Sequence, residues 1–184
     1  MLGSLTGPRY GEHKRLDRSG PTDGHMVSDG DSAPDFTAPL ANGDLGETFA
    51  LSERLDEAPL VLAFFPGAFS SVCTGEMNTF QERLADFHDA GARIYGISVD
   101  SPFALNAFRE DNSLEFDFIS DANHDIVDAY GATMGFEELG IDEVAQRAVF
   151  VVDGDGDITY SWTSEDPGVE PDYDEIEEAA RNAA

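Results

Sequence analysis

The chain has 184 residues, 41% of them hydrophobic and 10% aromatic, which is enough apolar material for the core of one domain. Its 38 acidic and 10 basic residues give a formal net charge of −28. A field of this sign repels nucleic-acid backbones and anionic membranes. The longest wholly apolar run, residues 60–65, is too short to cross a bilayer. We therefore expect a cytoplasmic protein without nucleic-acid or membrane partners.

The charge is divided abruptly near residue 26. Residues 1–25 hold four of the ten basic residues and three acids, whereas the remainder holds six arginines and 35 acids. The first segment also lacks a periodic apolar pattern, and such segments do not fold. The sequence therefore predicts that residues 1–25 are a disordered tag or upstream extension, and that one domain spans residues 26–184.

The body of the chain contains no lysine, because Lys14 is the only lysine in the sequence. A lysine-free and strongly acidic composition resembles that of proteins from salt-loving archaea. High salt screens the repulsion between surface carboxylates within a few ångströms. We expect the folded structure to be lost as salt is removed; the alternative is an acidic protein with no such requirement.

Apolar spacing predicts the elements of the first half of the chain. Residues 28–46 are rich in Pro, Gly, Asp and Asn and predict an irregular lead-in, followed by a short strand at 48–51. The continuous apolar run at 60–65 predicts a central strand buried on both faces. A helical stripe that ends at Gly91 then predicts one amphipathic helix. Its members are Cys73, Met77, Phe80, Leu84 and Phe87.

The second half continues the alternation of strands and helices. Ser101 and Pro102 have the residue types of a helix start, and Asp172 with Glu175 predicts a capping box at the final helix. Further strands are predicted at 94–99, 116–119, 148–152 and 158–162, and further helices at 102–112, 125–130 and from about 172. This order predicts an α/β fold with a mixed sheet.

Two groups of residues that could suggest a metal site do not meet the requirements of one. The acidic turn at 153–157 has the spacing that begins a calcium loop, but Ile158 and Ser164 stand where that loop needs Gly and Glu. A β-hairpin is the better interpretation. His88 and His124 are predicted to be surface or capping groups rather than metal ligands.

Cys73 is the only cysteine, which excludes an internal disulfide, a C-x-x-C pair and a thiolate zinc site built from this chain. It lies about seven residues after the predicted central strand, at the start of the helix that follows. Unpaired backbone N–H groups and the positive end of the helix dipole favour a thiolate there. The sequence therefore predicts a reactive nucleophile rather than a small buried hydrophobe.

Three stretches of the chain resemble the peroxiredoxin (alkyl hydroperoxide reductase / thiol-specific antioxidant) family. The segment FFPGAFSSVCTGEM matches the family signature Pro-x-x-x-Thr/Ser-x-x-Cys at Pro66, Ser70 and Cys73. QRAVFVVD resembles the family's arginine strand, and PDFTAP at 34–39 resembles its opening. The resemblance covers roughly residues 30–165. It implies a thioredoxin-like α/β/α sandwich and reduction of hydrogen peroxide or organic hydroperoxides without metal or flavin.

The resemblance also implies a role for each site residue. Cys73 attacks the peroxide and becomes a sulfenic acid. Arg147 stabilises the thiolate and holds the peroxide oxygens, and Ser70 donates its hydroxyl to thiolate or peroxide. Pro66 walls the pocket, and Glu76 orients Arg147. Backbone N–H groups of residues 72 and 73 complete the set of groups that hold the peroxide oxygens.

Two departures from the family pattern shape the expected mechanism. Ser70 replaces the commoner Thr, which keeps the hydroxyl and removes a methyl group. Asn78 stands where a resolving cysteine occurs in one branch. The resemblance is therefore to the one-cysteine type, in which a small thiol or a thioredoxin- or glutaredoxin-like protein reduces the sulfenic acid. We expect a monomer or homodimer. The alternatives are a peroxide-sensing module that relays oxidation to a partner protein, and a thioredoxin-like domain with a vestigial site.

Overall fold

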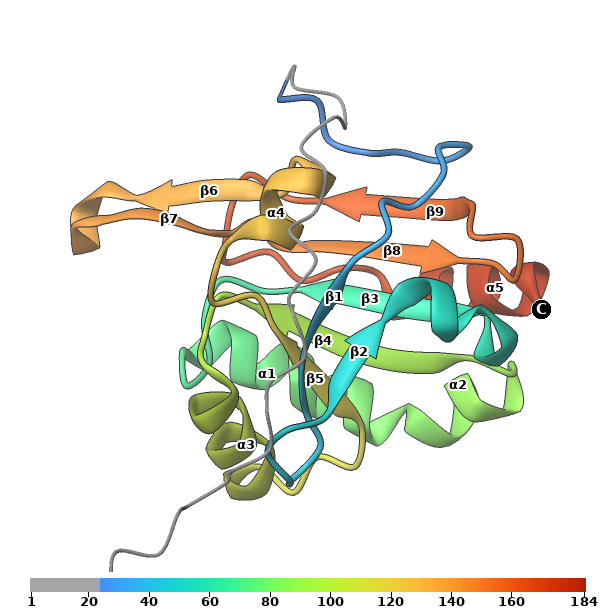
Figure 1. Cartoon of the computed structure of the whole chain (residues 1–184), viewed down its shortest axis with the longest axis horizontal. Helices are drawn as coiled ribbons and strands as arrows, with labels where there is room; N and C mark the ends of the chain where they lie inside the picture. Colours follow the sequence, from blue (N-terminus) through green and yellow to red (C-terminus); the bar gives the residue numbers. More distant parts are fainter. Residues whose placement is uncertain (1–23) are drawn as a thin grey trace, which may run out of the picture.

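A computed structural model describes residues 24–184 (Figure 1). The predicted tag or extension at 1–25 lies outside these residues except for its last two. Within the described part of the chain, no helix is long and apolar enough to span a membrane.

A seven-stranded sheet forms the centre of the fold (Figure 1). Its order is β2 (Thr48–Ala50), β1 (Thr37–Ala41), β5 (Asp117–Ser120), β4 (Arg93–Ser98), β3 (Leu60–Phe64), β8 (Ala148–Val152) and β9 (Ile158–Thr163). The neighbours β3, β4 and β5 run parallel, and every other pair in the sheet is antiparallel. The sheet is therefore mixed, as the order of elements in the sequence predicts.

The strand β3 is central because both of its faces are apolar. Leu60, Leu62 and Phe64 belong to one hydrophobic cluster, whereas Val61 and Ala63 belong to the other. All five residues of the strand are fully buried. A continuous apolar run is the pattern expected of a strand covered on both faces.

Helices cover the two faces unequally. One face is covered by α1 (Ser71–Glu82), α2 (Leu84–Asp89), α3 (Pro102–Asp111) and α5 (Tyr173–Ala183), whose apolar residues share one cluster with the sheet. The other face is covered by α4 (Asp125–Tyr130), together with aromatic side chains of the segment from Phe36 to Phe49. This arrangement is the α/β/α sandwich expected from the resemblance.

Two predictions in the first half of the chain are wrong in part. The predicted single helix is divided at Arg83, where the backbone leaves helical geometry (φ −99°, ψ 7°). The apolar residues on both sides of this break still face the same cluster, so their spacing does not reveal it. The predicted irregular lead-in contains strand β1, which includes Pro39, a residue that strands usually exclude.

A second sheet of two strands was not predicted. It consists of β6 (Thr133–Phe136) and β7 (Ile141–Ala145), joined by a short 3-10 turn at Glu137–Leu139. Figure 1 shows this hairpin standing out from the main sheet. Two glycines and four acidic residues interrupt its apolar alternation, so the sequence carries no clear strand signal there.

The two predicted helix starts and the predicted hairpin turn at 153–157 are largely confirmed. Ser101 accepts a hydrogen bond from the N–H of Ala104, and Asp172 accepts from residues 174 and 175. However, the Glu175 carboxylate lies near the Tyr160 hydroxyl, so the predicted reciprocal half of the capping box is not formed. Asp153 accepts from two N–H groups of the turn that joins β8 to β9.

The two histidines lie on or near the surface. His88 is exposed on α2. His124 precedes α4 but does not cap it; its ring lies 3.2 Å from Glu143, and Asp121 accepts the N–H groups of residues 126 and 127 instead. Among residues 24–184, no group of three or more His, Cys, Asp or Glu side chains is placed to hold a metal ion.

Candidate active site

Cys73 lies in the first turn of α1, as its distance from the central strand predicts. The chain leaves β3, turns through residues 65–70 and enters the helix at Ser71. The first intrahelical hydrogen bond runs from the N–H of Thr74 to the carbonyl of Ser70, at 2.9 Å. The N–H groups of residues 71–73 therefore lie at the positive end of the helix without an intrahelical acceptor. The Cys73 side chain is only 1% exposed.

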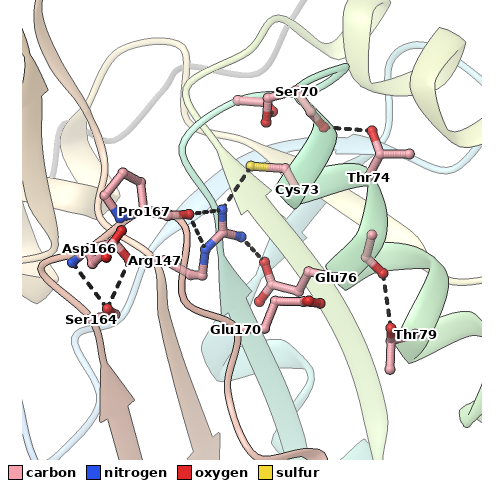
Figure 2. A network of polar contacts seen from close by, with 12 residues as sticks. Ser70, Cys73, Thr74, Glu76, Thr79, Arg147, Ser164, Asp166, Pro167 and Glu170 are labelled. Carbon is pink, nitrogen blue, oxygen red and sulfur yellow. Dashed lines mark hydrogen bonds and ion pairs between the residues drawn. The ribbon is translucent and has the colours of Figure 1, made fainter.

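Arg147 contacts Cys73 directly (Figure 2). Its Nη2 donates to Sγ at 3.3 Å, and its Nη1 donates to the carboxylate of Glu76. Its Nε and Nη2 also donate to the carbonyl oxygen of Pro167, at 3.2 and 2.8 Å. Four contacts from one planar guanidinium fix its orientation, because its donors form a rigid fork.

Strand pairing brings these distant residues together. Phe64 at the end of β3 is paired with Ala148 at the start of β8, and the two strands are antiparallel. The residues just after Phe64 and just before Ala148 therefore meet at one edge of the sheet. Arg147 precedes β8 and Cys73 follows β3, so this pairing places a guanidinium beside a thiol 74 residues away.

The Arg147–Glu76 pair is buried, with both side chains at most 1% exposed. Burial raises the pKa of the Glu76 carboxyl to about 7, against the opposing effect of Arg147. Burial lowers the pKa of Arg147, but the neighbouring Glu76 and Cys73 outweigh it, so the guanidinium stays charged. The second carboxylate oxygen of Glu76, Oε1, has no hydrogen-bond partner among the described residues.

Ser70 and Pro66 lie at the site but make different contacts from those of the other three. The Ser70 hydroxyl donates to the carbonyl of Gly67 at 3.1 Å and makes no hydrogen bond with Cys73 in the described structure. Pro66 lines the same pocket as Cys73. The structure thus joins Cys73, Glu76 and Arg147 in one contact network and leaves the other two in the surrounding wall.

A pocket of about 330 Å³ ends at Cys73 and Arg147. Its first wall is formed by residues 66–68 and 70–72, its second by the β6–β7 hairpin, and its third by the loop at Pro167 and Gly168. A small molecule in this pocket reaches a sulfur atom and a guanidinium at once. Such an arrangement can deliver an electrophile to a thiolate and stabilise negative charge on the atom that leaves.

Three groups that contribute to the candidate active site were not predicted from the sequence. The carbonyl of Pro167 orients Arg147, but a backbone carbonyl carries no residue-type signal. The apolar residues of the β6–β7 hairpin form one wall of the pocket, but the sequence has no alternating pattern there that predicts strands. Asp100 accepts from the N–H of Ala68 at 2.8 Å and from the Ser98 hydroxyl at 2.7 Å, which fixes the turn before α1. Its place two residues after the parallel strand β4 is a signal in the sequence, because the ends of parallel strands meet at one sheet edge.

Comparisons with known proteins agree with this geometry. Residues 30–161 match the AhpC/TSA family. A chloroplastic 2-cysteine peroxiredoxin of Chattonella marina var. antiqua is 34% identical over 139 residues, covering 72% of this chain and 68% of that protein. Alkyl hydroperoxide reductase C of Helicobacter pylori (strain J99) is 32% identical, covering 66% of this chain and 63% of that protein.

Solved structures point the same way. The crystal structure of peroxidoxin BcpB from Mycobacterium tuberculosis superposes with a TM-score of 0.74 at 28% identity, covering 87% of this chain and 99% of that one. The thioredoxin-like fold is thus confirmed, and the one cysteine in the sequence matches the one-cysteine type. On these grounds the chain belongs to the AhpC/TSA family and is a peroxiredoxin, a thiol peroxidase.

Proposed function

We propose that Cys73 is the peroxidatic nucleophile and that Arg147 is the group that stabilises its charge and the charge of the leaving oxygen. The contact that supports this most directly is the 3.3 Å hydrogen bond from Arg147 Nη2 to Cys73 Sγ at the end of a pocket. A cation that faces a thiolate lowers the cost of the charge, and it can follow that charge as it moves to oxygen.

The step balances with the groups at hand. The Cys73 thiolate attacks the terminal oxygen of a hydroperoxide, and a sulfur–oxygen bond forms as the oxygen–oxygen bond breaks. The electron pair leaves on the other oxygen, which takes a proton from water to become an alcohol, or water when the substrate is hydrogen peroxide. The sulfur is oxidised by two electrons to a sulfenic acid, and the peroxide is reduced.

Glu76 and the carbonyl of Pro167 act as positioning groups in this proposal. Each of them bonds to a different edge of the guanidinium and leaves one Nη2 hydrogen directed at the sulfur. Pro66 limits water in the pocket because it has no N–H and is stiff. Ser70 supplies a hydroxyl at the mouth that can turn toward a bound peroxide once it leaves Gly67.

The reductant comes from outside the chain, because a second cysteine is missing from the sequence. We propose a small thiol or a thioredoxin- or glutaredoxin-like protein, acting in the cytoplasm on a monomer or homodimer. The thiol attacks the sulfenic sulfur, water leaves, and a mixed disulfide forms that a second thiol reduces.

The first experiment mixes reduced protein with one equivalent of hydrogen peroxide and follows Trp162 fluorescence, with mass spectrometry of the quenched product. We expect rapid addition of one oxygen to Cys73 and none in the Cys73→Ser variant. Oxidation no faster than that of a free small thiol would overturn the proposal. Rapid oxidation without steady-state turnover, together with trapped partner disulfides, would favour the sensor function instead.

A separate proposal concerns the environment in which the enzyme works. The described part of the chain is strongly acidic and contains no lysine, so we propose adaptation to molar salt. We expect the melting temperature to rise steeply between dilute buffer and molar potassium chloride, as measured by circular dichroism. An unchanged melting temperature would contradict this.

A further inference from the structure

The wall that the hairpin contributes to the pocket is entirely apolar. Phe136, Leu139, Ile141 and Val144 all come from the segment spanning β6 to β7 and line the pocket that ends at Cys73. Among the residues that the structure describes, Arg147 is the only one with a charged side chain in the pocket lining, and it already contacts Glu76 and Cys73. The hairpin side of the pocket therefore offers contact surface for carbon atoms, whereas the hydroxyl groups of the lining belong to Ser70 and Ser71.

Exposed apolar side chains also gather at the mouth of this pocket. Leu139 is 70% exposed and Ile141 is 39% exposed. Phe69 is also exposed, but its ring packs against Phe108 of α3 and is not part of the pocket lining. Two of the six large hydrophobic residues that the described chain exposes therefore line this pocket. On so acidic a surface, grouped apolar residues mark a binding site.

The segment that supplies the apolar wall also carries exposed acidic residues. The segment 133–145 carries four carboxylates and no lysine or arginine: Glu137, Glu138, Asp142 and Glu143. An anionic ligand in this pocket would meet their repulsion, and it would lose hydration against the apolar wall. A second copy of this chain would bring a surface of the same sign, so a neutral ligand suits the pocket better than an acidic protein.

We infer that the β6–β7 hairpin is a substrate-specificity element, and that it selects uncharged hydroperoxides with an apolar tail over hydrogen peroxide and over anionic hydroperoxides. This inference rests on the proposed function, because it requires peroxide reduction at Cys73. The terminal oxygen reaches Sγ beside Arg147, and the tail lies against Leu139 and Ile141. The reaction is the one written above, with the tail leaving on the alcohol.

The test compares second-order rate constants for oxidation of Cys73 in the full-length protein, at the lowest salt concentration that keeps it folded. Cumene hydroperoxide is the apolar-tailed substrate, and hydrogen peroxide, which has no tail, is the internal reference. The double variant Leu139→Ser/Ile141→Ser should lower the cumene-to-hydrogen-peroxide ratio roughly tenfold, because two apolar contacts with the tail are lost. Leu45→Ser, which alters an exposed leucine that is not part of the pocket lining, should leave the ratio unchanged.

A matched pair of substrates isolates the charge. A medium-chain carboxylic-acid hydroperoxide and its methyl ester differ at pH 7 by one negative charge. We expect the ester to react roughly tenfold faster, because the acid must bring its carboxylate to an apolar and acidic wall. The variant Glu137→Gln/Glu138→Gln should narrow this difference.

The outcomes separate this inference from the proposed function. If no peroxide oxidises Cys73 rapidly, the proposed function fails. If Cys73 is oxidised rapidly but the cumene-to-hydrogen-peroxide ratio is the same in wild type and double variant, only the inference fails. It also fails if light scattering shows that the double variant converts a dimer to a monomer while both rate constants fall together, because the hairpin would then be an interface between copies.

Discussion

The two ends of the active-site pocket are built in opposite ways. At the inner end, Cys73, Glu76 and Arg147 are at most 1% exposed and are held by the central sheet and the first helix. At the outer end, the β6–β7 hairpin forms a separate two-stranded sheet whose connecting turn is exposed. If Cys73 and Arg147 act as proposed, the core fixes the reacting groups, whereas the proposed selection of substrate depends on an element with few buried contacts.

The buried end of the pocket requires Arg147 as a group of fixed orientation and not only as a positive charge. We expect Arg147→Lys to lower the rate constant of Cys73 oxidation about 10²–10³-fold for every peroxide, because the three tetrahedral donors of an ammonium cannot reproduce the four contacts of the planar guanidinium. Stopped-flow fluorescence measures the rate constant, and circular dichroism controls for folding. A loss below tenfold would mean that charge alone is sufficient.

The buried end should also respond to pH. Because burial raises the pKa of Glu76 from its ordinary value of 4.5 to about 7, the folded state holds its proton over a pH range in which the unfolded state has lost it. The contribution of Glu76 to stability is thus fully present below pH 4.5 and is lost as pH rises through 7. Relative to Glu76→Gln, the free energy of unfolding should fall by about 3 kcal/mol from pH 4.5 to pH 8.

Denaturant titrations of both proteins across this range measure that difference. A difference between wild type and Glu76→Gln that stays constant from pH 4.5 to pH 8 would show that Arg147 keeps Glu76 ionised throughout. The inner end of the pocket would then be held by a permanent ion pair.

We expect the smallest effect on stability from a substitution in the hairpin, and the same substitution of a leucine in the core serves as the comparison. Leu139→Ala should change the free energy of unfolding by less than about 0.5 kcal/mol, because the side chain is mostly exposed. Leu62→Ala in β3 removes the same atoms from a fully buried site and should cost about 2–5 kcal/mol. Comparable losses in chemical denaturation would show that the hairpin is part of the cooperative core.

The sequence alone was sufficient to predict those structural features that depend on residues close together in the chain. The apolar run at 60–65 determined a strand buried on both faces, and Ser101 and Asp172 determined helix starts through side chains that reach N–H groups two or three residues away. The position of Cys73 at a helix start follows in the same way from the strand, the turn and the apolar stripe around it. The resemblance to peroxiredoxins then supplied a role for each site residue.

Tertiary structure decided what depends on distant segments. The pairing of β3 with β8 places Arg147 at the thiol, and the carbonyl of Pro167 reaches the guanidinium from the loop after β9. The Ser70 hydroxyl donates to the carbonyl of Gly67, an acceptor that the turn before α1 supplies. The hairpin wall, too, exists only because β6 and β7 pair with each other beside the pocket. Backbone acceptors and pairings between strands leave no mark on residue type, so only the folded chain reveals them.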